Sequence, residues 1–509
     1  MTPFATLPAM IAAQRQDAIA IQSPNGVALQ YGQLAQLMAS TSTLLRSHGL
    51  ARTDRVALVL DNGPEMACAF LAVASACTVA PLNAAYRGEE FAFYLTDLGA
   101  KALIVAQASD SAAIQAARDR GIQVFELQAL PAAGSGSFTL RATAPEKRSE
   151  AAPEQLATAQ DVALILHTSG TTSRPKIVPL SHGNLCASAR NIGTTLQLQS
   201  SDCGLHVMPM FHIHGLIAGL LAPMAVGSRI FCTPGFNALR FFGWMKESKP
   251  TWYTAVPTMH QAILARASHN LEVIRSNPLR FVRSSSSSMP PQVIAEIEQV
   301  FGAPLIESYG MTEAAHQMAS SPLPPARRIP GSVGLAAGPQ IAIMGENRQL
   351  LGSGQVGEVV IRGDNVTSGY ENNPDANAEA FVNGWFRTGD QGVLDTDGYL
   401  TLTGRLKEII NRGGEKISPR EVDEVLMDHP AVAQVVTFAM PHPKLGEEVA
   451  AAVVLRESMV CDEAQLRAFA ASRMADYKVP RKILLLSEIP KGATGKLQRI
   501  GLAAKLGLT

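Results

Sequence analysis

The sequence predicts an α/β protein, with a large N-terminal domain of parallel-rich βα subdomains plus a β-rich subdomain and a small α+β C-terminal domain. Three observations predict this class. Strand-like and helix-like segments alternate in the first half of the chain, antiparallel-type strands occur between residues 357 and 404, and the last hundred residues carry their own helices and strands. The length of 509 residues also favours several units, because one hydrophobic core rarely organises so long a chain.

Strand, helix and strand alternate in the first half of the chain. Residues 56–60 (VALVL) predict a buried strand, and the apolar run from Met66 to Leu82 predicts a buried helix, since it is shorter than a membrane span and includes polar residues. A helix over residues 89–98 and a strand over residues 102–105 repeat the pattern, which is typical of parallel βαβ units. Residues 129–156 are rich in Ala, Gly, Ser, Pro and charge, so we expect an exposed connection.

The second half predicts antiparallel strands and then a separate unit. Strands are expected at residues 357–363 and 399–404, with an Asp-Gly turn signal just before the second. We expect a domain boundary between residues 1–404 and 405–509, with a hinge around residues 405–408. The elements predicted beyond this hinge are a helix (Pro419–Leu426), two strands (Val432–Phe438 and Val449–Leu455), a helix (Asp462–Arg473) and a strand (Lys482–Leu486).

Composition and charge favour a small-molecule partner. Lys plus Arg and Asp plus Glu number 43 each, so no net field would attract nucleic acid or an anionic membrane. The six cysteines form no C-x-x-C pair, which is typical of buried free thiols in a reducing compartment. The first residues lack the features of a secretory signal, and the final Gly-Leu-Thr is no peroxisomal address. A cytoplasmic location is therefore expected, whereas the oligomeric state stays open.

A hydroxyl-rich segment is the first candidate for chemistry. Residues 168–176 (TSGTTSRPK) directly follow a predicted strand at residues 162–166 (VALIL). Hydroxyls, backbone N–H groups and one ammonium suit a polyphosphate. The segment is not a Walker loop, because G-x-x-x-x-G-K-[ST] is absent. Taken alone, the hydroxyl run is also compatible with a flexible polar turn.

Two other patterns do not carry the chemistry that they suggest. A G-x-G-x-x-G occurs at residues 352–357, but the strand-like EVVIR follows it where a dinucleotide site needs a helix N-terminus. His206, His212 and His214 suggest zinc, but no carboxylate or thiolate at ligand spacing joins them. We therefore expect neither a dinucleotide fingerprint nor a zinc site.

Several motifs in a fixed order point to one family. They are residues 168–176 (TSGTTSRPK), 309–313 (YGMTE), 388–390 (TGD), 404–408 (GRLKE), 411–417 (NRGGEKI) and 490–496 (PKGATGK). With this series the chain resembles the AMP-forming acyl-CoA synthetases of the adenylate-forming superfamily over nearly its full length. Two departures occur, at Ser173 and Ile177, where the family commonly has glycine. Neither removes a charge that the reaction needs.

The resemblance implies that the enzyme uses ATP and Mg²⁺. It implies that the phosphates are held by Thr168, Ser169, Gly170, Thr171, Thr172 and Lys176. It implies that adenine and ribose are bound by Glu307, Tyr309, Gly310, Met311, Thr312, Asp390 and Arg405. Magnesium ligands would be Glu313 and Thr168. The implied catalytic residues are Lys496, Lys176, Glu313, Thr171 and His212, of which Lys496 would bridge the carboxylate and the α-phosphate.

Coenzyme A is the second co-substrate that the resemblance implies. Its thiol must reach the acyl carbon from a side that Lys496 first occupies, and family members rotate a mobile C-terminal domain to allow this. The hinge would be Lys407. Gly413, Gly414 and Lys416 would contribute to the coenzyme A site, and a plain turn is the alternative interpretation of the two glycines.

The acid site carries a narrower signal. The segments FHIHG (211–215), RSSSSSM (283–289) and EAAH (313–316) are too polar for a fatty chain. They are similar to segments of the oxalyl-CoA synthetases of plants and fungi, which implies oxalate as the acid. The implied substrate-binding residues are Ser286, Ser288, His316, His212 and His214.

Other interpretations of this site stay open. Ser286 and its neighbours could form a polar loop without ligand contact, and the acid could be another short, polar or aromatic one. A peptide-synthetase adenylation domain, a luciferase-type enzyme and a non-catalytic nucleotide-binding protein of the same fold are the remaining alternatives.

Overall fold

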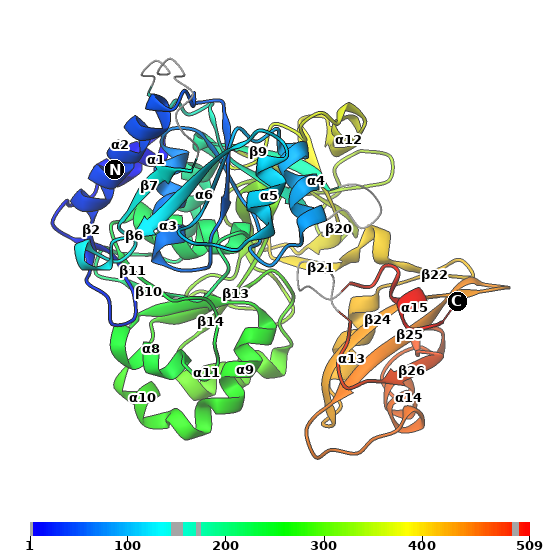
Figure 1. The fold of residues 1–509 in the computed structure, drawn as a ribbon. Helices are drawn as coiled ribbons and strands as arrows, with labels where there is room; N and C mark the ends of the chain where they lie inside the picture. Colours follow the sequence, from blue (N-terminus) through cyan, green and yellow to red (C-terminus); the bar gives the residue numbers. More distant parts are fainter. Residues whose placement is uncertain (1–3, 144–155, 169–174, 491–497, 509) are drawn as a thin grey trace.

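A computed structural model describes residues 4–143, 156–168, 175–490 and 498–508 (Figure 1). Within these residues, four β-sheets and the helices around them confirm the predicted α/β class. Among the described helices, none combines the length and the apolar character that crossing a bilayer requires.

A seven-stranded sheet confirms the predicted βαβ pattern near the N-terminus. Its order is β7-β6-β5-β3-β4-β8-β9, and β3 pairs in parallel with both β4 and β5. The strands are β3 Arg55–Val59, β4 Thr78–Pro81, β5 Ala102–Ala106, β6 Gln123–Ala129, β7 Phe138–Ala142, β8 Val162–Thr168 and β9 Lys176–Ser181. The helices are α3 Pro64–Ala74, α4 Gly88–Leu98 and α5 Ala112–Arg118.

Two expectations for this region were wrong. The predicted helix from Met66 to Leu82 ends at Ala74, and Thr78–Pro81 forms β4 instead. A run that is apolar on every side fits a buried helix and a doubly covered parallel strand equally well, so the pattern could not separate them. The expected exposed connection at residues 129–156 contains β7, which pairs with β6 in the antiparallel direction. The side chains of Phe138 and Leu140 on β7 are buried, and the residue between them is exposed.

A nine-stranded sheet contains the strands that carry most of the predicted site. Its order is β16-β15-β14-β13-β12-β10-β11-β1-β2, with β10 to β14 parallel and β15 antiparallel to β14. The strands are β1 Ile19–Gln22, β2 Leu29–Gln30, β10 Cys203–His206, β11 Arg229–Cys232, β12 Trp252–Ala255, β13 Phe281–Ser285, β14 Leu305–Met311, β15 His316–Ser320 and β16 Leu335–Ala336. Because carboxyl ends of parallel strands meet at one edge, β13 and β14 deliver their last residues to the same place.

Helices cover this sheet and separate it from the first one. They are α1 Leu7–Ala12, α2 Tyr31–Ser47, α6 His182–Thr195, the π-helical η2 His214–Leu221, α7 Ala222–Ala225, α8 Phe241–Ser248, α9 Pro257–Ala267, α10 Leu271–Ser276 and α11 Pro291–Phe301. Ten of the eleven residues of helix α3 are buried, and nine of them belong to an apolar cluster that includes side chains from both sheets. The two sheets therefore share one core, while α8 to α11 gather beside β13 and β14 (Figure 1).

A five-stranded antiparallel sheet forms the predicted β-rich subdomain. Its strands are β17 Gln340–Met344, β18 Gly357–Arg362, β19 Phe381–Val382, β20 Trp385–Leu394 and β21 Leu400–Arg405, and α12 Pro374–Ala380 precedes β19. The predicted strands at residues 357–363 and 399–404 are confirmed, but each pairs with β20, which the sequence did not indicate. Strand β18 begins at Gly357, so no helix N-terminus follows the G-x-G-x-x-G at residues 352–357.

The C-terminal unit has a sheet and an apolar core of its own (Figure 1). Its strands are β22 Ile410–Arg412, β23 Glu415–Ile417, β24 Val432–His442, β25 Gly446–Leu455 and β26 Lys482–Leu485, and its helices are α13 Pro419–Met427, α14 Glu463–Ala471 and α15 Leu502–Lys505. Each element predicted beyond residue 418 is present within a few residues of its expected bounds. A 3-10 turn, η5 Leu406–Glu408, separates β21 from β22, and the division after residue 404 stays a prediction.

Candidate active site

The two ends of the hydroxyl-rich segment meet at the edge of the seven-stranded sheet. Thr168 ends β8 and Lys176 begins β9, and these two residues are paired in the antiparallel register. The Lys176 ammonium lies 4.3 Å from the centre of the Tyr370 ring. Ser169, Gly170, Thr171, Thr172 and the terminal Lys496 lie outside the described residues. The two described ends of the segment are therefore neighbours in the sheet.

Tyr370 also connects Lys176 with Glu313. The Tyr370 hydroxyl donates a 2.9 Å hydrogen bond to Glu313 Oε1, and only 6% of Glu313 is exposed. Burial raises the pKa of Glu313, and the Tyr370 hydrogen bond and the charges of Arg405 and Lys176 oppose that rise. No sequence motif drew attention to Tyr370, since a single tyrosine outside a motif carries no signal of its own.

Asp390 joins two of the predicted nucleotide-binding residues. It faces Arg405 in the β20–β21 register, and Arg405 Nε donates to Asp390 Oδ1 at 2.9 Å. The Tyr309 hydroxyl donates to the other carboxylate oxygen at 2.5 Å. The charge of Asp390 raises the pKa of Arg405, and burial raises that of Tyr309 well above its ordinary value. These three predicted residues therefore form one hydrogen-bonded group.

Glu307 is a second buried carboxyl on β14. It is 8% exposed, and the Met289 backbone N–H donates to its Oε1 at 3.3 Å. Burial raises the pKa of Glu307 to about 7. The Glu307 carboxyl therefore loses its proton at a higher pH than an exposed glutamate does.

Gly310 allows β14 and β15 to approach closely. A Cβ at Gly310 would lie 1.6 Å from the carbonyl oxygen of His316, so no larger residue fits. Met311 pairs with His316 in the same register, and Thr312 begins the 3-10 turn η4 Thr312–Ala314 that carries Glu313. The predicted nucleotide motif and the predicted acid-binding histidine therefore share one turn.

Three predicted acid-binding residues are brought together from three elements. His214 starts η2, Ser286 follows β13, and His316 starts β15. His214 Nδ1 lies 3.1 Å from Ser286 Oγ, and its Nε2 lies 2.7 Å from Thr254 Oγ1. The His214 and His316 rings stack with centroids 4.9 Å apart. We call Ser286, His214 and His316 the acid-site trio.

The backbone around the trio is strained. Ser286, Ala315 and His316 have φ of 74°, 46° and 97°, in the region that non-glycine residues avoid. Each such residue costs about 1–3 kcal/mol and persists only where surrounding contacts hold it. Two segments that meet at the trio both carry this strain, which is typical of a functional site.

His212 and Ser288 are the other two residues predicted to bind the acid. The His212 ring lies 4.3 Å from that of Phe211. Ser288 is exposed, two residues beyond Ser286. His206 Nε2 lies 3.0 Å from the Gly215 carbonyl oxygen. Within the described part of the chain, no group of three or more His, Cys, Asp or Glu side chains is arranged to hold a metal ion.

Arg283, which the sequence reasoning missed, lies directly behind the trio. It is fully buried on β13, and burial lowers its pKa to about 9. Its guanidinium nitrogens lie within 3.3 Å of five side chains: His214, Thr254, Ser308, His316 and Gln317. In the sequence it is an ordinary basic residue before a serine run. The one signal that the sequence offered for Arg283 was its position directly after the apolar pair Phe281 and Val282, within a predicted polar site segment.

The predicted hinge and coenzyme A residues lie around the β22–β23 hairpin. Lys407 is in η5, and Gly413 and Gly414 form the hairpin turn with φ of 58° and 101°. Lys416 Nζ lies 3.2 Å from Glu346 Oε1, and both side chains are mostly exposed, so this ion pair contributes little stability. Their roles stay predictions.

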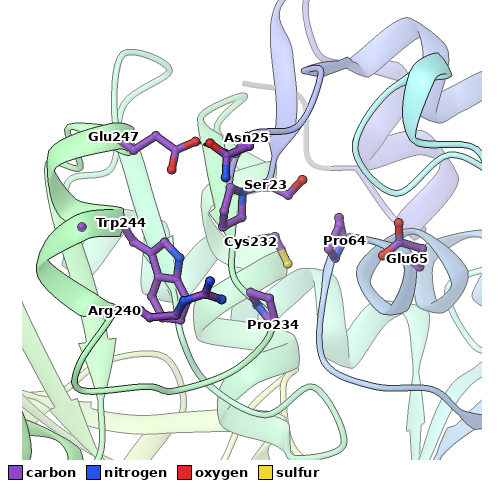
Figure 2. Close-up of a pocket in the computed structure, with 11 residues that line it drawn as sticks. Ser23, Asn25, Pro64, Glu65, Cys232, Pro234, Arg240, Trp244 and Glu247 are labelled. Carbon is purple, nitrogen blue, oxygen red and sulfur yellow. Dashed lines mark hydrogen bonds between the residues drawn. The ribbon is translucent and has the colours of Figure 1, made fainter.

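A cavity of about 560 Å³ lies elsewhere in the N-terminal domain (Figure 2). It is bounded by the β1–β2 connection, the start of α3 and helix α8. The Asn25 backbone N–H donates to Glu247 Oε1 at 2.7 Å across its edge. None of the predicted site residues lines it.

The fold is that of an adenylate-forming enzyme, and the residues predicted to bind the nucleotide lie on β14, β20 and β21. Residues 9–371 match the AMP-binding enzyme family, and residues 421–496 match the C-terminal domain of AMP-binding enzymes. The chain belongs to the AMP-binding enzyme family.

Similar proteins confirm the resemblance to AMP-forming acyl-CoA synthetases. An oxalate–CoA ligase of Arabidopsis thaliana is 45% identical over 464 residues, covering 90% of each chain. An oxalate–CoA ligase of Saccharomyces cerevisiae is 40% identical, covering 88% of this chain and 86% of the other. The ATP-bound crystal structure of MatB from Rhodopseudomonas palustris superposes with a TM-score of 0.87 at 27% identity, covering 98% of both chains. A non-catalytic nucleotide-binding protein is accordingly not favoured.

Proposed function

We propose that this enzyme is an ATP-dependent carboxylate–CoA ligase that converts oxalate to oxalyl-CoA, with release of AMP and pyrophosphate. The observation that carries the choice of acid is the polar trio of Ser286, His214 and His316, in which both imidazoles are buried and Ser286 is partly exposed. Oxalate is a small dianion, and its second carboxylate needs donors to offset the loss of water. A fatty chain would need apolar walls instead. The names of the plant and yeast relatives agree with this choice.

The first half-reaction forms an acyl-adenylate. A carboxylate oxygen attacks the α-phosphorus of ATP, and the bond from that phosphorus to pyrophosphate breaks. Negative charge grows on the transferred and departing phosphates, so the cations Lys176 and Lys496 would stabilise the transition state. Asp390 would accept hydrogen bonds from the ribose hydroxyls, with Arg405 beside it. Thr168 and the hydroxyls of residues 169–172 would hold the β and γ phosphates.

Magnesium fits the donor chemistry of Glu313. Mg²⁺ usually takes one or two carboxylates and completes its shell with water and substrate phosphates, so a single buried carboxylate is sufficient. Glu313 and the Thr168 hydroxyl would hold the ion. Bound there, it would neutralise charge on the triphosphate. The hydrogen bond from Tyr370 favours the ionised form of Glu313 and so opposes the effect of burial on its pKa.

The second half-reaction transfers the acyl group to coenzyme A. The thiol loses its proton, its sulfur attacks the acyl carbon, and the bond from that carbon to the AMP oxygen breaks. We propose that the C-terminal unit rotates about Lys407 between the two steps, so that Gly413, Gly414 and Lys416 border the coenzyme A path. His212 and Ser288 are proposed as additional acid-site residues.

The cysteines support a reducing, cytoplasmic location. All six are free and buried, and burial raises the pKa of the Cys68, Cys77, Cys186, Cys203 and Cys232 thiols. A buried neutral thiol reacts slowly with oxidants and disulfides.

A panel of acids tests the proposed function. Release of AMP with ATP, Mg²⁺ and coenzyme A is measured for oxalate, glycolate, malonate, butyrate and cinnamate. We expect kcat/KM to be highest for oxalate by at least about tenfold, because a monocarboxylate leaves the polar trio unmatched. A large preference for butyrate or cinnamate would overturn oxalate as the acid. Absence of AMP release with every acid, in folded protein that binds ATP, would overturn the ligase itself.

A further inference from the structure

Arg283 is a buried cation without a buried anion. Its side chain is fully enclosed, yet within the described ranges no carboxylate forms an ion pair with it, and burial is the one cause of its lowered pKa. All five side chains in contact with its guanidinium are neutral hydroxyl, amide or imidazole groups. Its Nε has no hydrogen-bond partner. A buried charge is costly unless an opposite charge compensates it, so the site favours an anion that arrives with the substrate.

The contacts of Arg283 fix the proton positions on both histidines of the trio. A guanidinium can only donate, so His316 Nε2, which lies 3.2 Å from Arg283 Nη2, must accept. Arg283 Nη1 also lies 3.3 Å from Thr254 Oγ1, which leaves the Thr254 hydroxyl proton to donate to His214 Nε2 at 2.7 Å. In a neutral imidazole one nitrogen accepts and the other carries the proton. Both rings are therefore set as Nδ1–H tautomers.

This arrangement determines what Ser286 can do. With its proton on Nδ1, His214 donates to Ser286 Oγ across 3.1 Å. The hydroxyl then has its own proton left for a ligand, and an incoming carboxylate is the acceptor that suits it. The chain of contacts from Arg283 through Thr254 and His214 to Ser286 thus converts a buried positive charge into a donor at the acid site.

We propose that Arg283 is a positioning residue that makes the acid site selective for a second negative charge, a role that rests on the proposed function insofar as the acid binds at the trio. It acts in two ways. It orients both imidazoles and Ser286 as donors, and its own charge is compensated when the second carboxylate of a dianion occupies the site. An acid of similar size with one charge gains the first effect but not the second.

Oxalate and glycolate distinguish these effects, because they are similar in size and differ by one carboxylate. In Arg283→Met, we expect the ratio of kcat/KM for oxalate to that for glycolate to fall about 10- to 100-fold. This is the change expected when one interaction with a charged group is lost. KM for oxalate should rise while KM for ATP changes less than about twofold. Arg283→Lys keeps the charge and should retain most of the ratio. Arg266→Met, at an exposed position on α9, is the matched control.

Each outcome decides the proposal. An unchanged oxalate-to-glycolate ratio in folded Arg283→Met, or equal losses with both acids, would reduce Arg283 to a structural residue. If Arg283→Met fails to fold in thermal unfolding, Arg283→Lys decides instead: collapse of the ratio in that folded variant overturns the role of charge. Thr254→Val interrupts the contact with His214 and should raise KM for oxalate while keeping the preference for a dianion. Should the wild type prefer another acid, the proposed substrate fails, and the same ratio measured with a matched dicarboxylate and monocarboxylate pair still tests Arg283.

Discussion

Replacing Tyr370 by Phe removes one hydroxyl and retains the ring under Lys176. The hydroxyl donates at 2.9 Å to Glu313 Oε1, and Glu313 is 6% exposed, so water cannot easily replace the lost bond. The variant therefore isolates one contribution to the proposed magnesium and phosphate site, namely the hydrogen bond that favours the ionised form of the buried Glu313 carboxyl.

The magnitude follows from the type of bond. A hydrogen bond to a charged group contributes about 1.5–3 kcal/mol, equivalent to about a 10- to 150-fold change in an equilibrium. The lost bond favoured the ionised form of Glu313, so the pKa of Glu313, already raised by burial, rises further in the variant. At a given pH a smaller fraction of Glu313 is ionised. We expect kcat/KM for ATP to fall about 10- to 100-fold near pH 7 and the defect to shrink as pH increases.

The assay is pyrophosphate release with varied ATP and Mg²⁺ between pH 6 and 9. Tyr399→Phe is the matched control, because its hydroxyl donates to the Arg327 carbonyl at 2.6 Å, apart from the predicted site residues. A defect in Tyr370→Phe that is the same at every pH would refute the role of Glu313 ionisation. An equal defect in Tyr399→Phe would show that loss of packing or stability, not the site, lowers activity.

Three further substitutions test other parts of the site. Gly310→Ala places a Cβ 1.6 Å from the His316 carbonyl oxygen, so thermal unfolding should show a Tm lower by more than about 5 °C, whereas Gly243→Ala, with open space on α8, should not lower it. Lys496→Ala should abolish adenylate formation yet keep much of thioester formation from a supplied acyl-adenylate, and equal loss of both would contradict the proposed rotation. His316→Ala should raise KM for oxalate about tenfold and KM for ATP little; an unchanged KM for oxalate would make His316 a structural residue.

The sequence predicted best where local pattern and packing agree. The strands over residues 56–60, 102–105 and 162–166 are short apolar runs, and each matches a mostly buried strand to within two residues at either end. The run from Met66 to Leu82 was assigned to a single helix because apolar residues on every side give no period. What decides between α3 and β4 there is the neighbouring chain that covers them.

The candidate site likewise contains residues that the sequence could predict and residues that only the fold reveals. The motif residues Asp390, Arg405 and Tyr309 were found because their order along the chain is characteristic, and the fold joins them by hydrogen bonds. Arg283 and Tyr370 were not, because each acts through residues far away in the sequence. Only the pairing of β13 with β14 and of β14 with β15, or the approach of Tyr370 to η4, makes their contacts visible.

The Asp390–Arg405 pair lies at the last residues that β20 and β21 share before the chain turns toward the C-terminal unit. Turning about the backbone bonds of residues 406–408 would reorient everything downstream while leaving this ladder intact. A nucleotide held there could then keep its place through both half-reactions. The adenylate need not be released and recaptured when the second co-substrate enters, which protects a readily hydrolysed intermediate from water.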